Sequence, residues 1–92
     1  MLKVKFTVQM KKGMQLMRKR GKNMDKIIEV IDLLASGHTL LAKYQDHALK
    51  GDMKNARECH IEPDWLLIYQ VFDGTLILSC TATGTHDDLF KK

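Results

Sequence analysis

Hydrophobic and polar residues alternate over the first eight positions of the chain. A period of two is typical of a strand with one buried face, so the sequence predicts a half-buried strand at residues 2–8. The apolar members of this alternation are Leu2, Val4, Phe6 and Val8.

The spacing lengthens to helical periods in residues 10–39. A first helix carries a methionine stripe and should end near Gly21, and a second should end near Gly37. Core packing explains the stripe more simply than a cofactor site does. The apolar positions are Met10, Met14 and Met17 in the first helix and Ile27, Val30, Ile31 and Leu34 in the second.

The period of two returns after a polar stretch at residues 38–55, which predicts a loop. Three further strands are expected, at Arg57 to Ile61, Trp65 to Phe72 and Thr75 to Thr83. The order strand, helix, helix and three-strand meander predicts a single α+β domain over residues 1–92. In this fold a small antiparallel sheet packs against the two N-terminal helices.

Two turns determine how the last three strands meet. Glu62-Pro63-Asp64 forms the first, and Asp73-Gly74 is a two-residue hairpin signal of type I′. The chain beyond the last strand then arrives beside the first turn, so His86 should meet His60 and Asp64 at one end of the sheet. The predicted pairs are Phe72 with Thr75, Leu66 with Thr81 and Asp64 with Thr83.

Positive charge is concentrated in the first third of the chain. The 92 residues carry a net charge of +4. Residues 1–26 hold nine Lys or Arg and one Asp, a net charge of +8, whereas residues 27–92 hold six basic and ten acidic residues, a net charge of −4. The basic region is either a surface for a polyanion or a solvated helix face.

The distribution of apolar residues and cysteines disfavours a membrane-spanning or secreted protein. The sequence contains no run of about 18 apolar residues, and its alternating N-terminus lacks the apolar region of a signal peptide. Cys59 and Cys80 lie in apolar strand contexts and are interpreted as free, buried thiols. This usage suits a reducing compartment, so we expect a cytoplasmic protein.

Histidines and an aspartate that converge near a basic surface suggest proton transfer on an RNA phosphodiester. RNA can be cleaved without metal or cofactor when a base takes the 2′-hydroxyl proton and an acid protonates the leaving 5′-oxygen. Imidazole can perform either step near neutral pH. His60 and His86 are therefore candidates for these roles, and Asp64 either orients one of them or simply caps its turn.

Cations and aromatic residues near these positions could bind RNA. Trp65 begins a predicted strand, where a tryptophan is more often part of the core than a stacking platform. A zinc site is disfavoured because Cys59 and His60 are adjacent in a strand and point to opposite faces. The candidate phosphate contacts are Lys50, Lys54 and Arg57, the candidate stacking residues are Trp65 and Phe90, and the zinc alternative uses His47, Cys59, His60 and His86.

Three ordered motifs together resemble the YafQ-type branch of the RelE/ParE toxin superfamily. They are "DHALKG" at residues 46–51, "RECHIEPDWLLIY" at 57–69 and "TGTHDDLF" at 83–90. The resemblance implies the RelE-like microbial ribonuclease fold and a ribosome-dependent endoribonuclease that cleaves mRNA in the ribosomal A site. It marks His47, His60 and Asp64 as catalytic, His86 as the general acid, and Phe90 as an aromatic residue that places the RNA.

The resemblance also implies partners and exposes one departure. The partners are the ribosome, mRNA and a RelB- or DinJ-like antitoxin that holds the toxin inactive in a hetero-oligomer. Many relatives carry an arginine before "TGTH", where this chain has Ala82, so Arg57 or Lys54 would have to supply the charge that stabilises the transition state. The alternatives are a ParE-like toxin that poisons DNA gyrase and a non-catalytic RNA- or ribosome-binding module.

Overall fold

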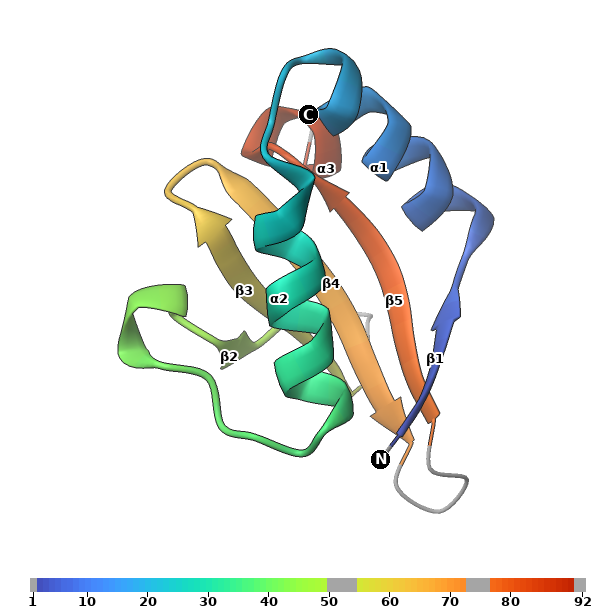
Figure 1. The fold of residues 1–92 in the computed structure, drawn as a ribbon, viewed down its shortest axis with the longest axis vertical. Coiled ribbons are helices and arrows are strands. Elements are labelled where there is room, and N and C mark those ends of the chain that lie inside the picture. The colour runs from blue at the N-terminus through green and yellow to red at the C-terminus, as the bar shows by residue number, and fades with distance from the viewer. Residues whose placement is uncertain (1, 50–54, 73–76, 91–92) are drawn as a thin grey trace.

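The computed structural model describes residues 2–49, 55–72 and 77–90. Their secondary structure is an α+β arrangement that starts with a strand and two helices, as the sequence predicts (Figure 1). In chain order the elements are β1 (Lys3–Phe6), α1 (Val8–Lys19), α2 (Met24–Ala35), the 3₁₀ turn η1 (Ala42–Tyr44), β2 (His47–Ala48), β3 (Ala56–Glu62), β4 (Trp65–Phe72), β5 (Ile77–Gly84) and α3 (His86–Phe90).

The strands form one mixed sheet in the order β1-β5-β4-β3-β2. β1 pairs with β5 in parallel, and the other three pairs are antiparallel. The antiparallel meander expected from the sequence is confirmed, and the parallel pairing of β1 with β5 makes the sheet of five strands mixed. The short strand β2 and the helix α3 are both additions to the predicted layout.

The first strand ends earlier than its alternation suggests because Thr7 starts α1. The Thr7 hydroxyl accepts a hydrogen bond from the Met10 backbone at 2.9 Å, a typical N-cap. The same hydroxyl donates to the carbonyl of Thr81 in β5 at 2.6 Å. Val8, predicted to be in the strand, is therefore the first residue of the helix.

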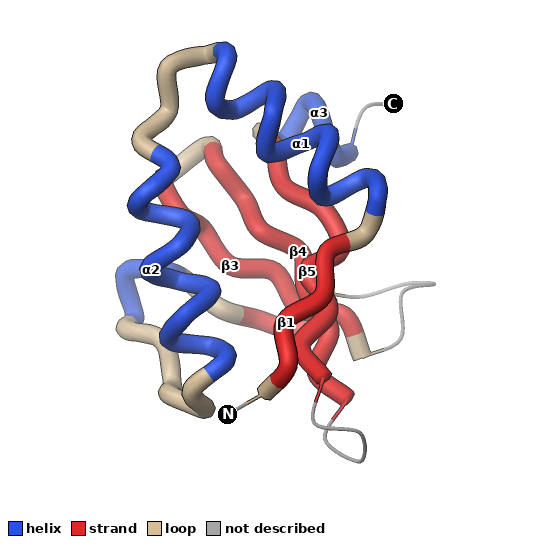
Figure 2. Tube along the Cα trace, turned by 45° about the vertical axis from the view of Figure 1, so that its right-hand side comes forward, coloured by secondary structure: helices blue, strands red, loops and turns tan. Residues whose placement is uncertain are grey.

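The helices α1 and α2 cover one face of the sheet (Figure 2). The predicted stripes are the buried ones, because Met10, Met17, Ile27 and Val30 have no exposed surface. They pack with Cys59, Leu67, Tyr69 and Cys80 from the sheet in a large apolar cluster. A smaller cluster of Ala56, Ile68 and Ala82, joined by Leu49 and Leu89, belongs to the opposite face.

The register of β4 and β5 differs from the predicted one. Phe72 pairs with Ile77 rather than Thr75, so four positions separate the paired strand ends instead of two. A β-bulge then shifts the register between Ile68 and Tyr69, and Leu66 pairs with Gly84 rather than Thr81. The proposed turn at Asp73-Gly74 lies outside the described residues.

The bulge exchanges the faces on which β5 side chains lie. Cys80 belongs to the cluster on the helix side, whereas Ala82, only two positions later, belongs to the cluster on the opposite side. Thr83 is thereby placed on the helix side, where it accepts a hydrogen bond from the Trp65 indole at 2.9 Å. The bulge thus determines the face of the sheet on which Ala82 and Thr83 lie, just before the chain reaches His86.

Replacing Gly13 by alanine is expected to destabilise the protein by about 1–3 kcal/mol. A Cβ at Gly13 would collide with the backbone oxygen of Thr83, because α1 packs closely on β5 there. The usual gain in helix propensity, about 1 kcal/mol, would be outweighed. Urea unfolding against Gln15→Ala, an exposed position of the same helix, measures the difference. A Gly13→Ala protein that is more stable than the parent would contradict this packing.

None of the helices in the described ranges has the length and apolar content needed to cross a membrane.

Candidate active site

Three histidine rings lie side by side at one end of the sheet. They come from β2, β3 and the start of α3. The centroids of His47 and His60 are 6.3 Å apart, and those of His60 and His86 are 5.8 Å apart. The predicted convergence of His60, His86 and Asp64 is confirmed, and His47 joins them because β2 extends the sheet beyond β3.

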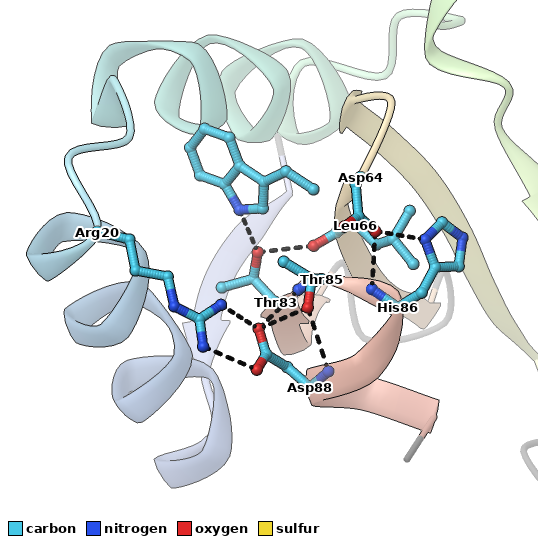
Figure 3. Close-up of polar contacts among 8 residues, drawn as sticks. Arg20, Asp64, Leu66, Thr83, Thr85, His86 and Asp88 are labelled. Atoms are coloured by element: carbon cyan, nitrogen blue, oxygen red, sulfur yellow. Dashed lines mark hydrogen bonds and ion pairs between the residues drawn. The ribbon is translucent and has the colours of Figure 1, made fainter. Parts of the chain in front are cut away.

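Asp64 makes two contacts to His86 through a single carboxylate oxygen (Figure 3). Its Oδ1 lies 2.6 Å from the ring Nδ1 and accepts from the backbone N–H at 3.1 Å. The hydrogen bond from the ring, followed by that from the backbone, lowers the pKa of Asp64 below its usual value. The carboxylate is therefore ionised near neutral pH, orients the ring, and leaves Nε2 for proton transfer.

Glu58 is a site residue that the sequence analysis missed. Glu58 is only 6% exposed. Its Oε1 lies 3.3 Å from Nε2 of His47 and 3.7 Å from Nε2 of His60. Glu58 pairs with His47 across β2 and β3 and lies two positions before His60, so all three share one face. The i, i+2 spacing from Glu58 to His60 could be seen in the sequence, but the pairing of Glu58 with His47 in β2 could not.

The second nitrogen of His47 is also held. Nδ1 lies 2.7 Å from the backbone oxygen of Gln45, and because a carbonyl only accepts, this nitrogen carries a hydrogen. Gln45 has a φ of 48°, in the left-handed region that non-glycine residues seldom occupy. The turn before β2 thus fixes the direction in which the His47 ring faces Glu58.

Arg57 lies on the other face of β3, away from the histidines. Its neighbours Cys59 and Ile61 in the same alternation belong to the cluster on the helix side. Its Nε donates to Asp46 at 3.0 Å, and it also hydrogen-bonds Tyr69, its cross-strand partner. Nearness in sequence had suggested a phosphate contact at the histidines, and strand alternation corrects that expectation.

The other residues predicted to contact RNA differ in how accessible they are. Trp65 is fully buried, so the core interpretation holds and no base can stack on it in this conformation. Phe90, at the end of α3, is 44% exposed and remains accessible. Lys50 and Lys54 lie outside the described residues.

The zinc alternative is not supported by the positions of its ligands. Cys59 is buried in the cluster on the helix side, and burial raises the pKa of its thiol to about 12. Within residues 2–49, 55–72 and 77–90, no three His, Cys, Asp or Glu side chains are grouped so that they could hold a metal ion. As they stand, these residues do not fit a metal centre.

Ala82 stands immediately before "TGTH", where the resemblance led us to expect an arginine. It is 3% exposed and packs with Ala56 and Ile68 on the side of the sheet opposite α1 and α2. Glu58 shares that side because it pairs with Ile68 in β3 and β4. A long side chain at position 82 would therefore start on the same face as the carboxylate that contacts two of the histidines.

Fold and site together define a small α+β protein with an acid–base centre at one end of its sheet. A family model described as a bacterial toxin of a type II toxin-antitoxin system, YafQ, matches residues 2–91. The chain belongs to this YafQ family of bacterial toxins.

Individual relatives agree with this assignment over nearly the whole chain. The mRNA interferase toxin YafQ of Escherichia coli K12 is 40% identical over 88 residues, which cover 95% of this chain and 94% of the relative. The crystal structure of the E. coli DinJ–YafQ complex matches with a TM-score of 0.90 and 37% identity, covering 98% and 99% of the two chains. A metal-bound toxin from Helicobacter pylori matches with a TM-score of 0.93 and 36% identity, covering 98% and 100%.

Proposed function

We propose that this chain, as a single toxin domain, is an mRNA interferase that cleaves mRNA in the ribosomal A site. The observation that carries the proposal is the group of three histidine rings with His86 held by Asp64 at 2.6 Å. The name of the E. coli relative, an mRNA interferase toxin, supports the same activity. Such a toxin acts where ribosomes and mRNA are, in the cytoplasm.

In the proposed mechanism the histidines transfer two protons. His47 or His60 takes the proton from the 2′-hydroxyl, and the oxygen attacks the adjacent phosphorus. His86, protonated at both ring nitrogens and stabilised by the Asp64 carboxylate, gives its Nε2 proton to the leaving 5′-oxygen. Glu58 orients His47 and His60 because one of its oxygens lies near Nε2 of both rings. The products are a 2′,3′-cyclic phosphate and a free 5′-hydroxyl.

Surface charge and accessible aromatic surface support binding to RNA. The α1 helix carries five exposed basic side chains, Lys11, Lys12, Arg18, Lys19 and the adjoining Arg20. A surface of this charge attracts the phosphates of ribosomal RNA, and the attraction weakens as salt is added. Phe90 is accessible for stacking against a base.

The partner that controls the toxin is proposed to be a DinJ- or RelB-like antitoxin. A closely similar structure is that of a DinJ–YafQ complex, which supports a hetero-oligomer of toxin and antitoxin. An inactive complex would release activity only when the antitoxin is removed. Co-expression of this chain with a DinJ- or RelB-like antitoxin, followed by size-exclusion chromatography, tests for this complex.

Primer extension of mRNA from cells that express the chain tests the activity. Cuts that follow the codon register show cleavage in the A site, and they exclude both a gyrase poison and a passive ribosome-binding module. Intact mRNA under growth arrest, together with unrepaired DNA breaks, would favour a ParE-like toxin instead.

Removal of transition metals is expected to leave the cleavage rate unchanged. Imidazole groups transfer protons without a metal, and the described site residues do not form a metal-ligating group. The chelator 1,10-phenanthroline is suitable because it spares the Mg²⁺ that ribosomes need, and cleavage of programmed ribosomes gives the readout. Loss of activity with chelator and recovery with added metal would contradict a metal-independent reaction.

A further inference from the structure

Arg20, at the end of α1, forms a bidentate ion pair with Asp88 in α3 (Figure 3). One guanidinium nitrogen lies 2.8 Å from Oδ2 of Asp88, and the other lies 3.1 Å from Oδ1. Two parallel hydrogen bonds of this kind restrict orientation as well as distance. The pair therefore connects the tip of the basic helix to the short helix that carries His86.

The same Asp88 carboxylate fixes the first turn of α3. Its Oδ2 accepts hydrogen bonds from the Thr85 backbone at 2.9 Å and from the Thr85 hydroxyl at 3.0 Å. In return, the Asp88 backbone donates to the Thr85 hydroxyl at 3.2 Å. This reciprocal arrangement is a capping box, the sequence signature of which is "THDD". A helix of only five residues, His86–Phe90, needs such external support because short helices are not stable alone.

His86 is the residue that immediately follows Thr85, and its backbone direction is set by this turn. The Asp64 oxygen that contacts the ring also accepts from the His86 backbone N–H. Both contacts can be made at once only if the first turn of α3 is held in place. A shift of that turn would separate the ring from its carboxylate partner.

We propose that Arg20 and Asp88 are positioning residues that hold the proposed general acid His86 against Asp64. The inference rests on the proposed function of His86. Neither residue contacts the histidine rings directly, and they act through Thr85 and the first turn of α3.

The pair persists at the pH where the toxin would act. The hydrogen bond from Arg20, together with that from the Thr85 backbone, lowers the pKa of Asp88 to about 2. A depressed carboxyl pKa gives a stabilising contribution that is present above the ordinary value and is lost as the pH falls toward 2. Asp88 is therefore ionised throughout the neutral range.

Gly84 leaves the space that Asp88 needs. A Cβ at Gly84 would lie 2.8 Å from the Asp88 Cβ and 3.1 Å from its Oδ2. Gly84→Ala should therefore displace the Asp88 carboxylate without any change of charge. This substitution therefore disturbs the Asp88 contacts without changing the electrostatic attraction between the toxin and RNA.

The first test compares Asp88→Ala with Asp87→Ala, which removes the same charge from the neighbouring residue of the same helix. Single-turnover cleavage on programmed ribosomes should fall about tenfold for Asp88→Ala and stay within about twofold for Asp87→Ala. Gly84→Ala should resemble Asp88→Ala, and Asp88→Glu should recover part of the rate. Ribosome affinity, measured by co-sedimentation, should be the same for the two alanine variants.

Arg20→Ala needs its own control because it also removes a positive charge from α1. Arg18→Ala removes the same charge from the same helical turn. Both should weaken ribosome binding equally, but only Arg20→Ala should also lower the rate constant of the bound complex. The double variant of Arg20 and Asp88 should be no slower than the slower single variant, because the two residues act as one unit.

NMR of the His86 ring separates the positioning role from the proposed reaction. The signal of the Nδ1 hydrogen, assigned by its loss in His86→Gln, should shift or disappear in Asp88→Ala and persist in Asp87→Ala. Unchanged His86 signals in Asp88→Ala would overturn the inference, whatever the rate, and so would a shifted signal with full cleavage where His86→Gln itself is slow. If His86→Gln itself retains full cleavage, the proposed function of His86 fails, and the NMR comparison still decides whether Asp88 holds the ring.

Discussion

Replacing His86 by glutamine is expected to slow mRNA cleavage by about 10²–10⁴-fold, the usual contribution of a positioned general acid. Glutamine can still hydrogen-bond Asp64 but cannot give a proton to the leaving 5′-oxygen. The His86 side chain is 52% exposed, so its replacement removes little buried surface and the midpoint of unfolding should change little. Single-turnover cleavage on programmed ribosomes measures the rate, and co-sedimentation should show unchanged ribosome binding.

His38→Gln is the matched control, because it makes the same change at an exposed histidine after α2 and should retain full activity. A His86→Gln protein that still arrests growth without cleaving mRNA would identify a binding module or a gyrase poison. Full cleavage by His86→Gln would show that another group protonates the leaving oxygen. Either result would remove the observation that supports the proposed mechanism.

The parts of the fold that follow a clear period could be predicted from the sequence. The two helices and the long strands each repeat one period over several residues, and the buried residues are the periodic ones. The two-residue strand β2 is too short to show a period, so its stretch was expected to be a loop. The capping box "THDD" was a usable signal for α3, although a helix of five residues carries little periodicity of its own.

The register of β4 and β5 depends on details that alternation cannot reveal. A connection longer by two residues keeps every side chain on its expected face, and a bulge of one residue reverses the faces beyond it. The convergence of His86 on Asp64 survived both errors because Leu66 pairs with Gly84 rather than Thr81, so the chain reaches the first turn three positions later. The meeting of His86 and Asp64 at this end of the sheet was thus predicted correctly, although the predicted register was wrong.

The part of the candidate site that the two predicted turns bring together could be predicted, whereas the part that depends on the unexpected strand β2 could not. Arg57 was placed with the histidines by nearness in sequence, although alternation directs it to the opposite face and to Asp46. Glu58 was overlooked because its importance comes from His47, which pairs with it from β2. A carboxylate in the predicted strand had no visible partner until that strand pair was known.

The absence of an arginine at position 82 matters because negative charge at the phosphate must be stabilised in the transition state. A hydrogen-bond donor aimed at such a charge contributes about 10²–10³-fold in other enzymes. Arg57 is paired with Asp46 on the far face of β3, so it does not supply this charge in the structure described. The apolar cluster of Ala82, Ala56 and Ile68 occupies the face from which an arginine would extend.

We therefore expect Ala82→Arg to raise the cleavage rate of the bound complex by about 10–100-fold. The bulge in β5 directs residue 82 to the face that carries Glu58, and the long arginine stem can cover the apolar cluster while its guanidinium reaches outward. Single-turnover cleavage separates this gain from tighter ribosome binding, which one added positive charge also favours.

Ala82→Met controls for the added length without charge, and Ala82→Lys tests whether a point charge suffices or a planar fork is needed. We expect no gain from methionine and a smaller gain from lysine. Thermal unfolding must show that each variant is folded, since Ala82 is 3% exposed and space around it is limited. If folded Ala82→Arg cleaves no faster than the parent, another group of this chain already stabilises the charge.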